Sequence, residues 1–97
     1  MPCLRIIKVE DEVVVVICDR GLLGKEYKQG ELRLKIDRSF YDGKNASIRE
    51  CLEALEQATI ANLVGSIVKH AIKKGIIAEE NVLNIGGVLH AQLVRLK

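Results

Sequence analysis

Aromatic side chains are scarce in this 97-residue chain, which has no Trp, one Phe and two Tyr. Proteins that bind single-stranded nucleic acid usually stack bases on exposed rings, and here only Tyr27, Phe40 and Tyr41 are available for that purpose. The core must instead be built from Ile, Leu, Val and Ala. The shortage of rings therefore argues against recognition of nucleic acid by base stacking.

Paired cysteines are also missing. The chain has three cysteines, an odd number, and they are widely separated with no CxxC pair: Cys3, Cys18 and Cys51. This pattern indicates neither a disulfide framework nor a zinc site. His70 and His90 are the only imidazoles, and no spacing places either beside a nucleophile and an orienting group. We expect no catalytic residue, no metal and no cofactor, and a reducing cytoplasm as the simplest setting.

Long apolar runs and an excess of one charge are absent. The run VVVVIC is far shorter than the ~20 residues needed to cross a membrane, and the opening residues lack the pattern of a signal peptide. The net charge of +2 does not require a polyanionic partner, although a local patch remains open. With 48% hydrophobic and 29% charged residues, the composition predicts one globular domain over residues 1–97, with no membrane partner.

Five segments have the patterns of strands. Residues 4–9 and 13–18 are β-branched runs on either side of an acidic connection, which predicts an antiparallel hairpin. The second run has no alternation and is typical of a central strand buried on both faces. Residues 31–37 alternate as in a half-buried strand, and 81–85 and 88–96 are the last strands. We predict that residues 19–29 form a loop with one helical turn capped by Asp19.

Two segments have helical periodicity. Ser47 and Glu50 fit a capping box, and an apolar stripe with helical spacing follows. A second stripe, shifted in phase near Thr59, runs from 60 to 72 and should end at Gly75. The predicted fold is α+β, in the order β-β-β-α-α-β-β. It is a two-layer sandwich in which both helices cover one face of a largely antiparallel or mixed sheet of about five strands.

A glycine-rich segment resembles an anion-binding loop. Gly21 and Gly24 precede Lys25, but a P-loop needs wider glycine spacing and Ser or Thr after the lysine. The Gly-x-x-Gly of KH-type RNA modules joins two helices, whereas here a strand precedes it. Gly24 and Lys25 remain candidates for ligand binding, because a glycine lets backbone amides approach an anion and a lysine offers a charge. The alternative is that the glycines are ordinary turn residues.

Two groups of basic residues are candidates for contacts with nucleic-acid phosphates. One lies on the exposed side of the strand at 31–37, and the other lies in the last turns of the second helix. Solvated surfaces and the helix dipole explain the same residues equally well. The candidates are Arg33, Lys35 and Arg38 in the first group, and Lys69, Lys73 and Lys74 with His70 in the second.

A ligand pocket is predicted from two further features. Gly65 inside the helical stripe costs about 1 kcal/mol against Ala, which calls for a close neighbour or a ligand, and Asn62 lies three positions earlier. Asn62 could equally cap a helix beginning near Thr59. A tight turn at 86–87 would place His90 opposite Leu83, on a mostly apolar face that it shares with Gln92. A pocket formed by Asn62, Gly65, His90 and Gln92 would require these elements to converge.

Four segments together resemble an archaeal family known only as domain of unknown function 424: LLGKEYKQGELRLKI, FYDG, EQATIANLVG and NIGGVLHAQLVRL. The resemblance covers nearly the whole chain and implies an archaeal, cytoplasmic protein with a loose association with RNA or translation. It assigns no role to any residue. The positions that carry it are Gly24, Lys25, Asn62, Gly65, Gly86, Gly87, His90 and Gln92.

Three functions are open at this point. The leading hypothesis is a non-enzymatic binding module that acts with RNA or with a translation-associated protein, because no catalytic constellation is present and two basic groups are. The first alternative is a small enzyme or ligand-binding protein that uses the pocket just described. The second is a structural or oligomerising subunit, a homo-oligomer whose exposed strand edges pair between chains.

Overall fold

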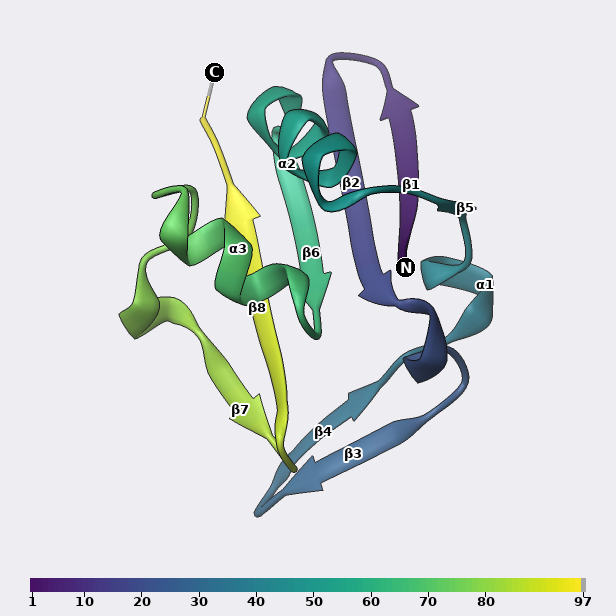
Figure 1. Cartoon of the computed structure of the whole chain (residues 1–97), viewed down its shortest axis with the longest axis vertical. Helices are drawn as coiled ribbons and strands as arrows, with labels where there is room; N and C mark the ends of the chain where they lie inside the picture. Colours follow the sequence, from purple (N-terminus) through teal and green to yellow (C-terminus); the bar gives the residue numbers. More distant parts are fainter. Residues whose placement is uncertain (97) are drawn as a thin grey trace.

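The computed structural model describes residues 1–96, which form a mixed six-stranded sheet, a separate hairpin and three α-helices (Figure 1). The sheet order is β5-β1-β2-β6-β8-β7, and the hairpin is β3-β4. The α+β class is thus as predicted. The elements are β1 (Pro2–Val9), β2 (Glu12–Asp19), η1 (Arg20–Leu22), β3 (Glu26–Gln29), β4 (Leu32–Lys35), α1 (Arg38–Tyr41), β5 (Lys44–Asn45), α2 (Ile48–Gln57), β6 (Ile60–Val64), α3 (Ile67–Lys73), η2 (Glu79–Asn81), β7 (Leu83–Ile85) and β8 (Val88–Val94).

The hairpin β1–β2 and the central position of β2 confirm the first strand predictions. β1 pairs antiparallel with β2, and Val9 lies opposite Glu12 across the acidic turn. Val15 belongs to the core under α2 and α3, whereas Val16 belongs to the core on the other face. Both side chains have no exposed surface, so the uninterrupted valine run marks a strand covered on both sides.

The prediction of a helix from residue 60 is wrong, because Ile60–Val64 is strand β6. This segment pairs parallel with β2 and antiparallel with β8, which satisfies its main-chain groups on both sides. Its apolar residues fit the spacing of a helix and of a buried strand alike, and the available strand partners decide between them. Only α3, from Ile67, keeps the helical part of that stripe, and Gly75 follows it with φ +78° as expected.

The ends of α2 are held by side chains. The predicted capping box is present, with Ser47 and Glu50 each accepting the other's amide at 3.1 Å. At the other end, Arg95 Nη1 donates to the Leu55 carbonyl at 2.6 Å and the Ala58 carbonyl at 2.9 Å. A cation on the last carbonyls stabilises a helix C-terminus. Arg95 follows the final strand, which ends at Val94 and not at Leu96 as predicted.

Two further boundaries differ from prediction. Residues 26–29, expected in a loop, form β3, and this strand pairs with β4 outside the main sheet. The predicted alternation of 31–37 is correct at Leu34 and Ile36, which are buried, but Leu32 at the tip is 46% exposed. The helical turn η1 forms, yet the Asp19 side chain does not cap it.

The two faces of the sheet have different covers. Helices α2 and α3 lie across one face, as predicted, and pack on an aliphatic core. The β3–β4 hairpin and α1 cover part of the other face over a second core that contains Cys3, Cys18 and Tyr41. No helix within residues 1–96 is long and apolar enough to span a membrane.

Candidate functional site

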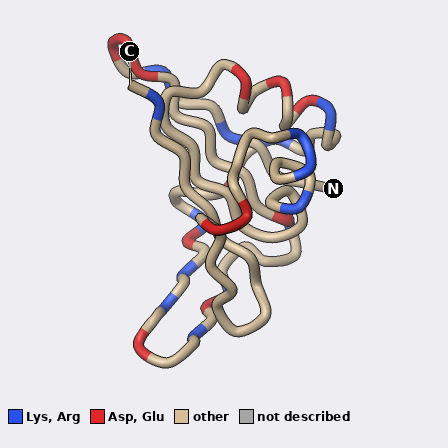
Figure 2. Tube along the Cα trace, turned by 90° about the vertical axis from the view of Figure 1, so that its left-hand side faces the viewer, with Lys and Arg blue, Asp and Glu red and all other residues tan. Residues whose placement is uncertain are grey.

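The β3–β4 hairpin presents most of its basic side chains on one side. In its register Glu26 lies opposite Lys35 and Lys28 lies opposite Arg33, so these four side chains point the same way. Tyr27 and Leu34 point to the other side and contact the core. We call Lys28, Arg33 and Lys35 the basic hairpin face. All three are exposed, and Figure 2 shows basic positions along both arms of this projecting hairpin.

The base of the hairpin brings three more predicted residues to this region. Gly24 has φ +81°, and its amide donates to the Ile36 carbonyl at 2.7 Å. Arg38 Nε lies 3.4 Å from the place that a Cβ on Gly24 would occupy. Lys25 is exposed beside them. Gly24 therefore serves the turn, and its amide is already occupied, whereas Lys25 and Arg38 are exposed cations at the base of the hairpin.

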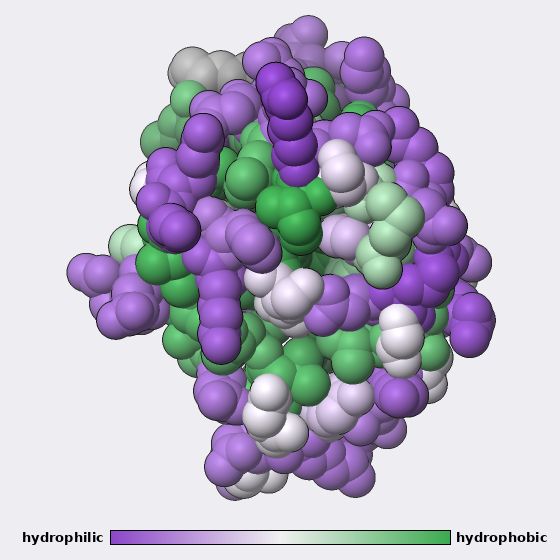
Figure 3. Space-filling model, in the orientation of Figure 1, coloured by the Kyte–Doolittle hydropathy of each residue, from purple (hydrophilic) through white to green (hydrophobic). Residues whose placement is uncertain are grey.

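The lysines in and after α3 line two different hollows. Lys69 lines a cleft at the start of α3, and Lys74 lines a groove between α2 and α3 together with Glu53 and Glu56. Figure 3 shows that groove as an apolar hollow ringed by hydrophilic side chains. Lys73 is exposed. The proposed contact of these lysines with nucleic acid remains a prediction, and Lys69 and Lys74 lie at different hollows.

The cleft beside Lys69 lies where the parallel strands β2 and β6 end. Its volume is about 520 Å³, and Asp19, Ser66 and Asn84 supply polar groups to its walls. The Asp19 carboxylate accepts the Ser66 amide at 2.9 Å and also the Ser66 hydroxyl. A Cβ on Gly65 would lie 2.3 Å from Asp19 Oδ2. The neighbour that Gly65 was expected to accommodate is therefore the Asp19 carboxylate.

Asn62, His90 and Gln92 lie on the sheet face opposite the helices. Asn62 is paired with Gln92, and His90 is two residues from Gln92 on the same strand, so the three share one face. Tyr41 Oη donates to Asn62 Oδ1 at 2.6 Å. His90 Nδ1 lies 3.1 Å from the Leu63 carbonyl, and it must donate because a carbonyl only accepts. None of the three lines the cleft beside Gly65, so their role in ligand binding stays a prediction.

The turn at Gly86 and Gly87 confirms the predicted register. Leu83 lies opposite His90, and both glycines have positive φ, at +61° and +92°. Asn84 Oδ1 accepts the Gly87 amide at 2.9 Å. The motif that carries the resemblance thus includes a tight β-turn, which fixes the pairing of β7 with β8.

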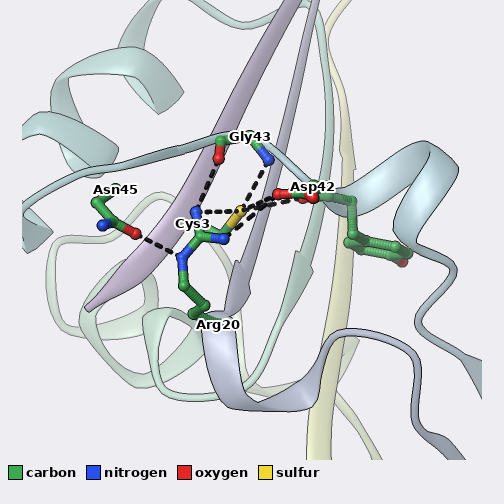
Figure 4. A network of polar contacts seen from close by, with 6 residues as sticks. Cys3, Arg20, Asp42, Gly43 and Asn45 are labelled. Carbon is green, nitrogen blue, oxygen red and sulfur yellow. Dashed lines mark hydrogen bonds and ion pairs between the residues drawn. The ribbon is translucent and has the colours of Figure 1, made fainter.

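A polar network around Cys3 was not found from the sequence (Figure 4). The buried Cys3 sulfur accepts from Arg20 Nη2 at 3.2 Å and from the Gly43 amide at 2.9 Å. Arg20 also donates to the Gly43 carbonyl at 2.7 Å and to Asn45 Oδ1, and it pairs with Asp42 at 3.3 Å. These contacts tie η1 to β1, to β5 and to the loop before β5. Since the residues come from distant segments, no spacing in the sequence reveals them.

The remaining thiols have little nucleophilic character. Burial raises the pKa of Cys18 to about 12 and that of Cys51 to about 11. Because the thiolate is the reactive form, both are nearly all protonated at neutral pH. Within residues 1–96 no three His, Cys, Asp or Glu side chains are grouped so as to hold a metal ion.

Comparison with known proteins agrees with this fold. A family model described as "Protein of unknown function (DUF424)" matches residues 7–96. The chain belongs to the DUF424 family. A crystal structure of an uncharacterised conserved protein from Methanopyrus kandleri is similar to it, with a TM-score of 0.74 and 28% sequence identity over 99% of this chain and 95% of that one. No protein with curated annotation shows significant similarity.

Proposed function

We propose that this DUF424 protein is an RNA-binding module that holds the phosphate backbone with its basic hairpin face. The supporting observation is the register of β3–β4, which aligns Lys28, Arg33 and Lys35 on the exposed side of a projecting two-stranded ribbon. Lys25 and Arg38 add two charges at its base. Arg33 is partly neutralised, since its Nε lies 2.9 Å from Glu26.

The proposed contact is with phosphates rather than with bases. Tyr27 is half-buried against the core, and the exposed positions of the basic hairpin face carry no ring. Without exposed rings the hairpin cannot stack bases, so its lysines and arginines would supply a sequence-independent attraction. Such binding releases counterions from the RNA and weakens steeply as salt rises.

The test is fluorescence anisotropy with a short labelled RNA stem-loop over a salt series. The variant Lys28→Gln/Arg33→Gln/Lys35→Gln removes three charges from the hairpin, and Lys69→Gln/Lys73→Gln/Lys74→Gln removes three from α3. For the first variant we expect at least about tenfold weaker binding. We also expect the plot of the logarithm of the binding constant against the logarithm of salt concentration to have a slope shallower by roughly 2 to 3, because each lost phosphate contact changes that slope by about 0.9. The second variant should bind within about threefold of the original chain.

Two outcomes would contradict the proposal. One is no binding by the unaltered chain at low salt, and the other is an equal or larger loss in the α3 variant. A translation-associated protein is the other partner that the resemblance implies. Co-purification of the chain with ribosomal proteins after complete nuclease digestion of the RNA would favour that protein and would also count against the proposal.

A further inference from the structure

One edge of the main sheet is long and largely unpaired. β1 spans eight residues, but on its outer side β5 pairs only with Cys3 and Leu4. Within the part of the chain that the structure describes, no strand pairs with Arg5–Val9 on that side, which is the upper right edge of the sheet in Figure 1. Ile6 is 46% exposed and Val9 is 54% exposed. Exposed edges with apolar residues are templates for pairing with another strand.

The hydrogen bonds at the start of β1 show which main-chain groups face this edge. The Met1 carbonyl accepts from Arg20 at 3.4 Å, on the β2 side, and the Pro2 carbonyl accepts from Ala46 at 3.0 Å, on the β5 side. In an antiparallel ladder this direction alternates from one residue to the next. The amide and carbonyl groups of Ile6 and Lys8 therefore point out of the sheet.

We infer that the open edge of β1 pairs antiparallel with the same edge of a second copy, about a two-fold axis at Ile7. In this register Ile6 of each copy lies opposite Lys8 of the other, and the two pairs exchange four main-chain hydrogen bonds. Ile7 lies opposite Ile7, and Arg5 lies opposite Val9. Every outward-facing group of Ile6 and Lys8 is then satisfied.

The sequence of the edge selects this register and this partner. An axis at Lys8 would place two ammonium groups opposite each other, which is unfavourable. An axis at Ile6 would require Leu4 to pair with Lys8, but β5 already occupies Leu4. The axis at Ile7 opposes no like charges and lays the aliphatic stem of Lys8 against Ile6. A strand that is complementary to itself in this way forms an isologous contact between identical copies.

The opposite edge of the sheet is a poorer candidate. β7 has three residues, and the β3–β4 hairpin lies beside its turn, where the Gly86 amide donates to Gln29 Oε1 at 3.1 Å. A Cβ on Gly86 would lie 2.9 Å from the Lys28 carbonyl. The β1 edge is therefore the better site for pairing. A dimer formed there would join the two sheets into one and would bring the Ile7 side chains of both copies together.

Sedimentation velocity from about 1 µM to about 1 mM tests the inference, a range that covers weak association. The matched variants are Lys8→Pro and Lys8→Ala. Both remove the side chain, but proline also removes the outward amide, which an edge position tolerates because the amide does not bond to β2. We expect a dimer whose Kd rises at least about tenfold in Lys8→Pro relative to Lys8→Ala, with circular dichroism showing both variants folded.

A second pair of variants tests the register. Ile6→Lys places a positive charge opposite Lys8 of the second copy and should weaken the dimer, whereas Ile6→Glu places a negative charge there and should bind at least as tightly as the original chain. A monomer at every concentration would overturn the inference. Equal Kd values for Lys8→Pro and Lys8→Ala, or for Ile6→Lys and Ile6→Glu, would do so too.

Discussion

The two faces of the central sheet are built on the same strands but are covered in different ways. On the helix face, one row of neighbouring residues crosses four strands and is entirely buried: Leu4, Ile17, Leu63 and Ala91. On the hairpin face, the next row along the strands contains Cys3, Cys18, Val64 and His90, and the one after it contains Arg5, Val16, Asn62 and Gln92. The helices cover their face with aliphatic contacts, whereas the hairpin face carries the polar side chains of Arg5, Asn62 and Gln92 in its second row.

The open end of the hairpin face shows what a small cover leaves exposed. Ile7, Val14, Ile60 and Val94 form its last four-strand row, and Val94 is 69% exposed. The β3–β4 hairpin and α1 cover this row only in part, since Val14 packs against the second core whereas Ile60 and Val94 are exposed. Specific polar contacts, such as Tyr41 with Asn62 and Arg20 with Cys3, hold this cover in place. The comparison predicts that stability depends on packing at one face and on individual polar contacts at the other.

The sharpest test of this difference uses two residues of β6. Leu63 is fully buried on the helix face, and Ile60 is 37% exposed on the hairpin face. We expect Leu63→Ala to lower the free energy of unfolding by about 3 kcal/mol, because it removes buried methyl groups and leaves a cavity. Ile60→Ala should cost less than about 1 kcal/mol, since its surroundings are partly solvent. Urea denaturation measures both, and equal losses would refute the comparison.

The junction between β6 and α3 provides the second test. Gly65 and Gly75 both have positive φ, at +93° and +78°, but only Gly65 has Asp19 where a Cβ would lie. Gly75→Ala should cost about 1 kcal/mol from backbone strain alone. Gly65→Ala should cost about 2 to 3 kcal/mol, because Asp19 must also move and lose its contact with Ser66. Thermal unfolding of the two variants would disprove this explanation if their losses were the same.

The smallest expected effect tests the polar contact of the hairpin face. Tyr41→Phe should lower the free energy of unfolding by about 1 kcal/mol at neutral pH, because one hydrogen bond to Asn62 is lost. Burial raises the pKa of Tyr41 to about 12 from its ordinary value of 10. Between these two values the unfolded chain loses the phenol proton first, so stability falls as pH rises from 10 to 12. Tyr41→Phe should show a shallower decline over that window in denaturation at a series of pH values, and an unchanged decline would contradict the assignment.

Several features could be predicted from the sequence because their cause is local. The valine run of β2, the Ser47–Glu50 capping box, the Gly86–Gly87 turn and the end of α3 before Gly75 each depend on residues within a few positions of one another. The alternation in β4 likewise predicted that Arg33 and Lys35 would be exposed together. These signals were sufficient for the fold class and for part of the basic hairpin face.

Tertiary structure decided the features whose residues meet only after folding. The apolar spacing of Ile60–Val64 fits a helix or a strand, and pairing with β2 and β8 made it a strand. Gly65 accommodates Asp19 from 46 positions earlier, with which Ser66 shares two hydrogen bonds. Lys69 and Lys74 line separate hollows, because residues five positions apart at helical spacing point to different sides of the helix axis. Folding pairs main-chain hydrogen-bonding groups and buries apolar side chains over the whole molecule. A segment whose local pattern fits either a helix or a strand therefore adopts the form for which the rest of the fold supplies partners.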